Sequence, residues 1–318
     1  MKKYFILAAS ALALAACTND LENANVAVND TQEAIKFTAC VGALEETRAG
    51  QAIQSQAFDT GEEIYVECIR SYSDRYTDAA TFADLNAIYV TGAAAGNVNA
   101  LSLKVTDPVQ DPFYWPARGT VSFKAFYPST VTESTTSFSV SENQTGTAGY
   151  KGSDLMWATA TGLDKTAVPT ATVGLTFNHA LSKIMINLTP GDGMTEADIA
   201  ACTVTIHAKK TATIAEGVVS AATGEVTDII AGVGAQNAAI IVPQTIDGHE
   251  TAQNFITITT DGNHPVTYKI DSEQVFLNGK VYTYNFTVNM EAVTLQSTSI
   301  NNWTAGDGGT SPGTDLTI

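Results

Sequence analysis

The most specific reactive group in this sequence is the thiol of Cys17. Leu14, Ala15 and Ala16 come directly before it, and this order resembles the bacterial lipobox. At a lipobox a peptidase cuts before the cysteine, and the thiol then carries fatty acyl chains such as palmitate. A plain Ala-x-Ala signal sequence with an incidental cysteine is the alternative. We expect Cys17 to be lipidated.

The residues around Cys17 suit that chemistry. Lys2 and Lys3 form a basic start, and the apolar run after them is about 13 residues long, too short to span a bilayer. We therefore expect residues 1–16 to be a signal peptide and the polar residues 17–32 to be a flexible tether. Each buried methylene of an acyl chain contributes about 0.8 kcal/mol to membrane binding, so several chains hold a protein without a membrane helix.

The other side chains capable of catalysis form no recognisable constellation. The chain has four histidines, and none lies at a metal-binding spacing. We expect His179 to be a half-buried histidine hydrogen-bonded across a sheet. The acidic pairs Glu45–Glu46 and Glu62–Glu63 lie in turn-like sequence and are expected to be solvated. The sequence therefore predicts no enzyme, no cofactor and no metal site.

Three further cysteines, Cys40, Cys68 and Cys202, are far apart in the sequence and form no CxxC pair. This spacing predicts neither a disulfide framework nor a structural zinc site. Cys40 and Cys68 each lie in an alternating apolar run. We expect both to be small core residues.

Composition sets the class of protein. The 318 residues are 44% hydrophobic and 15% charged, with a formal net charge of −17. Such a charge repels phosphate backbones and anionic lipid, so no nucleic-acid partner is expected.

Apolar residues mostly recur at every second position, as in "AIKFTACV", "TVSFKAFYP" and "KIMINLTP", and turn clusters separate these runs. The pattern predicts an all-β protein of two tandem β-sandwiches.

We place the predicted domains at residues 33–165 and 166–303, followed by a polar tail at 304–318. A Ser-, Thr- and Gly-rich stretch at 129–153 suggests the break between the domains. Two short helices are expected, near residues 78–88 and 195–201.

Aromatic residues are concentrated in one segment. The stretch "FYWPARGTVSFKAFYP" at 113–128 holds six aromatic residues. They could form a platform on which sugars stack. Because they alternate at strand spacing, we favour a core cluster.

Several segments in one order resemble the fimbrillin family, the lipoprotein pilins of Bacteroidetes. They are "FYWPARGTVSFKAFYP", "SDLMWA", "VGLTFNHALSKIMINL", "IIVPQT", "FLNGKVYTYNFTV" and "INNW". Together with the lipobox and "TRAG", the resemblance covers nearly the whole chain. It implies that the two sandwiches are transthyretin-like with Greek-key connections, and that the protein is a structural subunit of an adhesive pilus.

The resemblance also implies a route of maturation. Arg48 is one of four arginines, and by itself it is best explained as a surface charge in a loop. In the family, a trypsin-like protease cuts after an arginine in such a loop, the first strand leaves, and a strand of the next subunit takes its place. Carried onto this chain, the cut falls between Arg48 and Ala49. The departing strand is 34–41, with Ile35, Phe37 and Ala39 filling the groove.

The expected partners are other copies of this chain or related pilins, and the outer membrane through the lipid before processing. The expected location is therefore the outer membrane and the cell-surface fimbrium. The donor is expected within residues 291–318, where the tail 304–318 is a candidate region. A surface-anchored glycan-binding lipoprotein is the alternative, and a hydrolase is a distant third.

Overall fold

The computed structural model describes residues 33–42, 57–74, 77–105, 110–116, 119–165, 172–215, 218–232, 236–260, 265–289 and 293–303. Within these residues the protein is built almost entirely of strands, so the all-β prediction is confirmed. The two helices found there, α1 (Thr147–Gly152) and α2 (Glu196–Ala201), are one to two turns long. Neither is long and apolar enough to cross a membrane.

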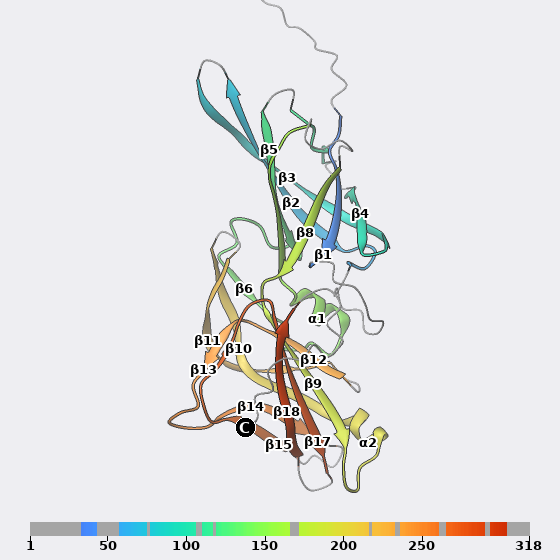
Figure 1. Ribbon diagram of the computed structural model, residues 1–318, viewed down its shortest axis with the longest axis vertical. Helices are drawn as coiled ribbons and strands as arrows, with labels where there is room; N and C mark the ends of the chain where they lie inside the picture. The colour runs from blue at the N-terminus through green and yellow to red at the C-terminus, as the bar shows by residue number, and fades with distance from the viewer. Residues whose placement is uncertain are drawn as a thin grey trace, which may run out of the picture. The chain divides into compact units, whose positions relative to one another are not determined.

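The first half of the chain forms a closed barrel (Figure 1). Its strands are β1 (Lys36–Val41), β2 (Glu63–Asp74), β3 (Thr77–Ala95), β4 (Val98–Leu103), β5 (Thr120–Tyr127), β7 (Met156–Leu163) and β8 (Thr172–His179). Around the barrel the order is β1-β4-β3-β2-β5-β7-β8, and β1 closes it by pairing with β4 on one side and β8 on the other. The sequence predicted a β-sandwich here, whereas the structure has a closed barrel, because its first strand pairs with both edges of the sheet.

The second half contains two larger sheets and a short ribbon. One sheet has the order β11-β10-β14-β15, with β6 added beside β10, and the other has the order β12-β9-β17-β18. The strands are β6 (Ser137–Ser139), β9 (Ser182–Pro190), β10 (Thr203–Ala215), β11 (Val218–Ile230), β12 (Gln236–Ile241), β14 (Gln253–Thr259), β15 (Pro265–Ile270), β17 (Lys280–Val288) and β18 (Val293–Asn302). β13 (Gln244–Ile246) and β16 (Gln274–Phe276) pair as the ribbon.

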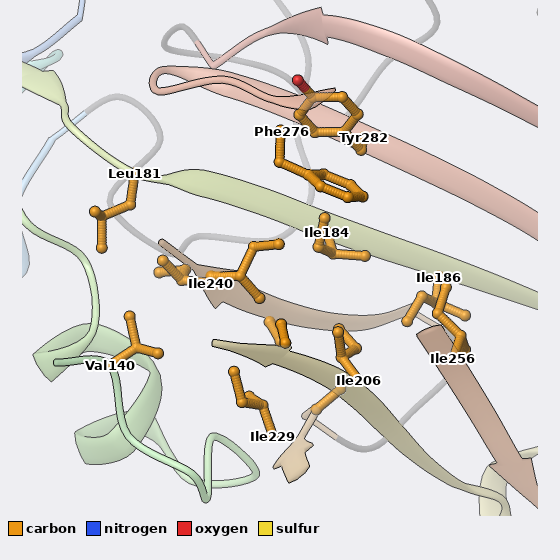
Figure 2. Packing of buried hydrophobic residues seen from close by; sticks show 14 of the residues in the cluster. Val140, Leu181, Ile184, Ile186, Ile206, Ile229, Ile240, Ile256, Phe276 and Tyr282 are labelled. Carbon is orange, nitrogen blue, oxygen red and sulfur yellow. The ribbon is translucent and has the colours of Figure 1, made fainter. Parts of the chain in front are cut away.

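Buried side chains from both larger sheets share one core. Figure 2 shows Ile184 and Ile186 of β9 close to Ile206 of β10 and Ile256 of β14. All four are at most 1% exposed. Strand alternation explains this, because every second side chain of β9 and β10 faces the other sheet.

The chain passes from the barrel core to the second core at residue 180. Phe177 belongs to the barrel core, whereas Ala180 and Leu181 belong to the other. The boundary that we expected near residue 165 lies between β7 and β8, which are strands of the same barrel. Pairing within the barrel therefore extends one strand, β8, beyond the expected boundary.

The polar stretch at 129–153 is not a simple linker. It leaves the barrel after β5 and adds β6 and α1 to the second half before β7 returns to the barrel. Val131, Phe138 and Tyr150 are buried in the second core. In the sequence these apolar residues are surrounded by small polar ones, so their burial was not predicted.

The two predicted helices had different outcomes. The helix expected near 195–201 is confirmed as α2, where the side chain of Thr195 accepts a hydrogen bond from the Asp198 backbone and completes a capping box. The helix expected near 78–88 is wrong, because these residues belong to β3, which pairs along β2. Cross-strand pairing outweighs the local helix preference of this alanine-rich segment.

Candidate functional site

The strand that closes the barrel, β1, has one face directed into the barrel core. Ile35, Phe37, Ala39 and Val41 are 3%, 2%, 1% and 0% exposed, respectively. The residues between them are exposed or half-buried, as the alternation of a strand requires. Ile35, Phe37 and Ala39, which the sequence analysis singled out, therefore lie together on the inward face.

Phe37 is the largest inward side chain of β1 and lies among three aromatic rings. Its ring centroid is 4.9 Å from that of Phe123, 5.1 Å from that of Tyr89 and 6.0 Å from that of Phe113. All three contacts are edge-to-face, which is a favoured arrangement for aromatic pairs. The barrel thus presents a preformed aromatic pocket to this one position of β1.

Backbone pairing holds β1 on both sides, but unequally. It runs parallel to β8 with six Cα partners and antiparallel to β4 with three. At its ends, the Ile35 N–H donates to the Phe113 carbonyl at 2.8 Å and the Gly42 N–H donates to the Phe177 carbonyl at 2.7 Å. Loss of β1 would leave β4 and β8 as facing edges with unpaired backbone groups.

The aromatic segment at 113–128 belongs to the cores. Five of its six aromatic residues are buried, and Tyr114 is half-buried. Phe113, Trp115, Phe123 and Tyr127 lie in the barrel core, whereas Phe126 belongs to the second core. This burial agrees with the core interpretation, because side chains inside the fold offer no face on which a sugar could stack.

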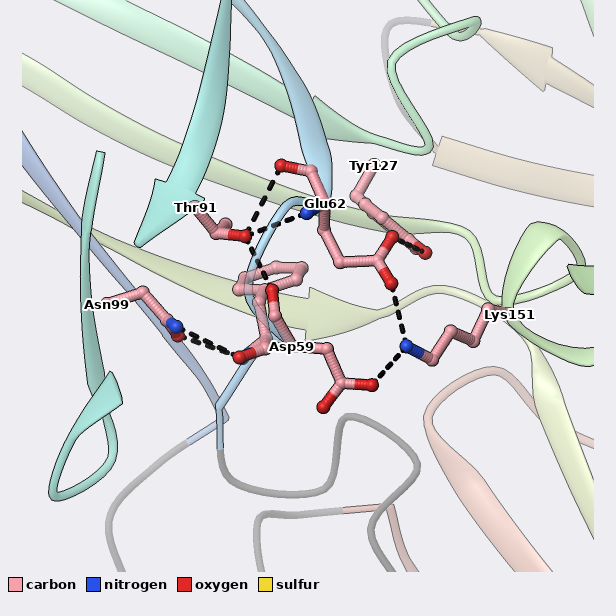
Figure 3. Close-up of polar contacts among 7 residues, drawn as sticks. Asp59, Glu62, Thr91, Asn99, Tyr127 and Lys151 are labelled. Carbon is pink, nitrogen blue, oxygen red and sulfur yellow. Dashed lines mark hydrogen bonds and ion pairs between the residues drawn. The ribbon is translucent and has the colours of Figure 1, made fainter. Parts of the chain in front are cut away.

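Phe58, near the start of the described segment that follows β1, is fixed to the barrel by one buried amide. Asn99 of β4, which is labelled in Figure 3, is 0% exposed, and its side chain forms hydrogen bonds with the backbone of Phe58. The Phe58 N–H donates to Asn99 Oδ1 at 2.9 Å, and Asn99 Nδ2 donates to the carbonyls of Phe58 at 2.9 Å and Gly92 at 2.8 Å. The ring of Phe58 packs on Tyr127 and Phe177. Asn99 therefore satisfies both backbone groups of Phe58.

A second set of polar contacts follows directly (Figure 3). The hydroxyl of Thr91 donates to the Asp59 carbonyl at 2.5 Å and accepts from the Glu62 N–H at 2.9 Å. Lys151 of α1 pairs with the carboxylates of Asp59 and Glu62, the latter at 2.7 Å, and Tyr127 donates to Glu62 at 2.8 Å. These contacts tie residues 59–62 both to the barrel and to the helix of the second half.

The charge of Lys151 is well supported. Burial by itself lowers the pKa of this ammonium group, but hydrogen bonds to Asp59 and Glu62 outweigh burial and raise the pKa above its usual value. Lys151 therefore stays charged at neutral pH and keeps both ion pairs.

The described chain ends at Trp303, whose ring stacks on His179 at the end of β8. The ring centroids are 3.8 Å apart and the planes differ by 7°. His179 is more buried than predicted, at 5% exposed, and its Nδ1 lies 2.8 Å from Oδ1 of Asp154. The backbone N–H of Trp303 donates to the Gly279 carbonyl at 2.6 Å. The expectation of a half-buried histidine bonded across a sheet is therefore wrong, because His179 is buried and its partners Asp154 and Trp303 lie just outside the strands.

The remaining residues considered in the sequence either lie outside the described part of the chain or form no metal or disulfide site within it. Cys17, Arg48, Ala49 and the tail 304–318 are outside the described residues. Among the residues that are described, no group of three His, Cys, Asp or Glu side chains could hold a metal ion. Among the described cysteines, Cys40, Cys68 and Cys202 form no disulfide; Cys68 and Cys202 are buried, whereas Cys40 is half-buried instead of lying in the core.

Asn99, Thr91 and Lys151 were not predicted from the sequence. Each is polar, lies in sequence without a recognisable motif, and is buried because distant segments meet around it. The contact between Lys151 and Glu62 spans 89 residues. Local sequence patterns carry no signal for such a contact.

In a comparison with models of protein families, residues 47–303 match a family described as fimbrillin-like. The chain belongs to the fimbrillin-like family. The match includes all barrel strands except β1, which precedes it. A search of curated proteins found no match to this fimbrillin-like chain.

Solved structures share the fold of this fimbrillin-like chain. A candidate cell adhesion protein from Bacteroides uniformis aligns with a TM-score of 0.63 at 21% identity, covering 85% of this chain and 98% of that one. Another from Bacteroides ovatus gives 0.62 at 17% identity, covering 87% and 99%. The tip fimbrial protein Mfa3 from Porphyromonas gingivalis, truncated at its C-terminus, gives 0.46 at 9% identity over 85% and 100%, too distant to carry an argument.

Membership in the fimbrillin-like family supports a role as a fimbrial subunit. It implies a place in a cell-surface fimbria and assembly with other pilin subunits. It also suggests a structural protein, not an enzyme.

Proposed function

We propose that this chain is a fimbrial subunit that is exported as a lipoprotein on Cys17, cut between Arg48 and Ala49, and polymerised by strand exchange. In this scheme β1 leaves with the lipid after cleavage. An extended segment of another subunit then occupies its place between β4 and β8.

The burial of the inward face of β1 is the observation that carries the proposal. Four consecutive inward side chains are at most 3% exposed, and this strand is the first in the barrel. Burying one large apolar side chain contributes about 1.5–3 kcal/mol. A vacated groove would therefore strongly favour any segment that refilled its pockets and restored the backbone pairing, which is the physics of strand addition.

The contacts of residues 58–62 support the same scheme. If the chain is cut after Arg48, the mature protein begins shortly before Phe58. Asn99 and Thr91 bind residues 58–62 without involving β1. The remaining barrel strands would therefore keep their new N-terminal segment in place while the groove is open.

The proposed contact uses different surfaces on the two subunits, because one supplies a groove and the other a strand. Such a contact repeats as a filament and does not close on itself as a symmetric dimer does. The acyl chains would hold the uncut subunit at the outer membrane until cleavage releases it.

Limited trypsin treatment of the purified chain tests the cleavage step. We expect the first cut in the folded protein after Arg48, with Arg48→Ala abolishing it and the matched control Arg75→Ala leaving it unchanged. Size-exclusion chromatography and electron microscopy of the cut protein should show polymers only when Arg48 is present. A first cut after Arg70, Arg75 or Arg118 would make the assignment of Arg48 wrong.

Deletion of residues 304–318 tests the donor step separately. If the tail supplies the incoming strand, the cut protein lacking it no longer polymerises with itself. Polymers of unchanged length would place the donor elsewhere.

A further inference from the structure

The resident strand β1 defines what can replace it, and this inference rests on the strand exchange proposed above. We propose that the incoming segment belongs to a partner subunit and has the pattern apolar-x-aromatic-x-small-x-apolar. We also propose that it lies parallel to β8, in the direction of β1.

The second inward position selects an aromatic side chain. Phe37 fills it, with its ring between 4.9 and 6.0 Å from the rings of Tyr89, Phe113 and Phe123. A smaller side chain would leave a cavity among these rings, because protein interiors repack only partly around a deletion.

The third inward position selects a small side chain. Ala39 is 1% exposed and lies opposite Asn99 on β4 and Leu175 on β8, which are both 0% exposed. The side chain of Asn99 is already committed to the backbone of Phe58 and Gly92. A bulky residue would have to displace these contacts, and overpacking of a filled core is destabilising.

The direction follows from the backbone pairing. β1 pairs with β8 in parallel over six residues, twice as many as with β4. Parallel and antiparallel ladders use different hydrogen-bond patterns, so a strand running the other way would have to rebuild the longer of the two ladders. Reversal would also bring the small residue to the aromatic pocket and the aromatic residue to the small one.

The residues at 312–318 match this pattern poorly. When Ile318 takes the place of Val41, Leu316 falls on the position of Ala39 and Thr314 on that of Phe37. The small pocket then receives leucine and the aromatic pocket receives threonine. We therefore assign the groove to a segment of a partner subunit instead of this tail.

Peptide binding to the cut protein tests the pattern. A specific protease site is inserted after Arg48, Cys17 is changed to serine, and the cut protein is separated from β1 in moderate urea. It is then refolded with a labelled peptide, and binding is measured by fluorescence anisotropy and by the recovery of the thermal midpoint. The probe is the peptide of residues 33–41 carrying Cys40→Ser.

Three further peptides serve as comparisons. The first carries Phe37→Ala together with Ala39→Phe and so keeps the composition while exchanging the two side chains. The second has the reversed sequence, and the third is residues 304–318. We expect the native peptide to bind and to restore the midpoint, and the other three to bind at least about tenfold more weakly.

The outcomes separate this inference from the proposed function. If the native peptide fails to bind, strand exchange itself is refuted. If it binds but the exchanged or reversed peptide binds equally well, exchange stands and the pattern or the direction is wrong. Equal binding of residues 304–318 would overturn the assignment to a partner of different sequence.

Discussion

Replacing Phe37 with alanine should destabilise the uncut protein and leave the polymer unchanged. The side chain is 2% exposed and contacts three aromatic rings. Truncating a buried phenylalanine typically costs about 3–5 kcal/mol. We expect the uncut Phe37→Ala protein to lose free energy of unfolding in this range. After cutting and polymerisation the loss should vanish, because the altered strand is no longer part of the fold.

Phe123 provides the matched control. Its ring lies 4.9 Å from that of Phe37 and it is 0% exposed, but it belongs to β5, which stays in the mature protein. Phe123→Ala should therefore lower the stability of the uncut protein and of the polymer alike.

Urea denaturation followed by tryptophan fluorescence measures both forms, because Trp115 is buried in the same core. The decisive quantity is the difference between Phe37→Ala and wild type in the polymer. A polymer destabilised as much as the uncut protein would show that β1 remains in place and would refute strand exchange.

Three further predictions concern the groups around the groove. Asn99→Ala should cost about 2–3 kcal/mol in urea denaturation, because it leaves the buried backbone groups of Phe58 unpaired, whereas the exposed Asn86→Ala should be neutral. Lys151→Met should destabilise the protein at neutral pH. Folding raises the pKa of Lys151, so the contribution of its charge to the free energy of unfolding is complete below the unfolded value of 10.5 and is lost as the pH rises through the folded pKa. The difference in unfolding free energy between Lys151→Met and wild type should therefore shrink over this alkaline range, which urea titrations at several pH values would measure. Burial raises the pKa of Tyr89 from 10.0 to about 12, so the wild type should lose stability relative to Tyr89→Phe as the pH rises above 10.0. An ultraviolet difference titration of these two proteins should place the ionisation of Tyr89 near 12 in the uncut form, and a value near 10.0 would contradict its burial.

Local alternation was enough to predict individual strands and their inward faces. Ile35 just before β1, Phe37 and Ala39 within it, and Val173, Leu175 and Phe177 of β8 alternate in the sequence and are all buried. A strand with one buried face shows this two-residue period of apolar residues in its sequence, wherever the strand lies in the fold.

Which strands become neighbours could not be predicted in this way. The barrel closes through pairing of residues 36–41 with residues 172–177, so no short window contains both partners. The alternation of β1 is the same in an open sandwich and in a closed barrel. For this reason the sequence analysis identified the strand but not the closure.

The error at residues 78–88 has a related cause. Phe82, Leu85 and Ile88 are spaced three residues apart in alanine-rich sequence, which favours a helix locally. In β3 the pairing with β2 shifts register between Cys68 and Arg70, opposite Leu85 and Phe82. A bulge of this kind interrupts the two-residue period and makes a strand resemble a helix in sequence.

The stacked pair of Trp303 and His179 has a mechanical consequence. A pulling force on the chain beyond residue 303 would act first on Trp303. Its buried ring stacks on His179, the last residue of β8, and its backbone N–H is hydrogen-bonded to Gly279. Tension applied at that end would therefore be shared between the barrel and the second half from the start. A molecule tethered through this end would bear the load at the junction of its two cores before the hydrogen bonds of β18 came under strain.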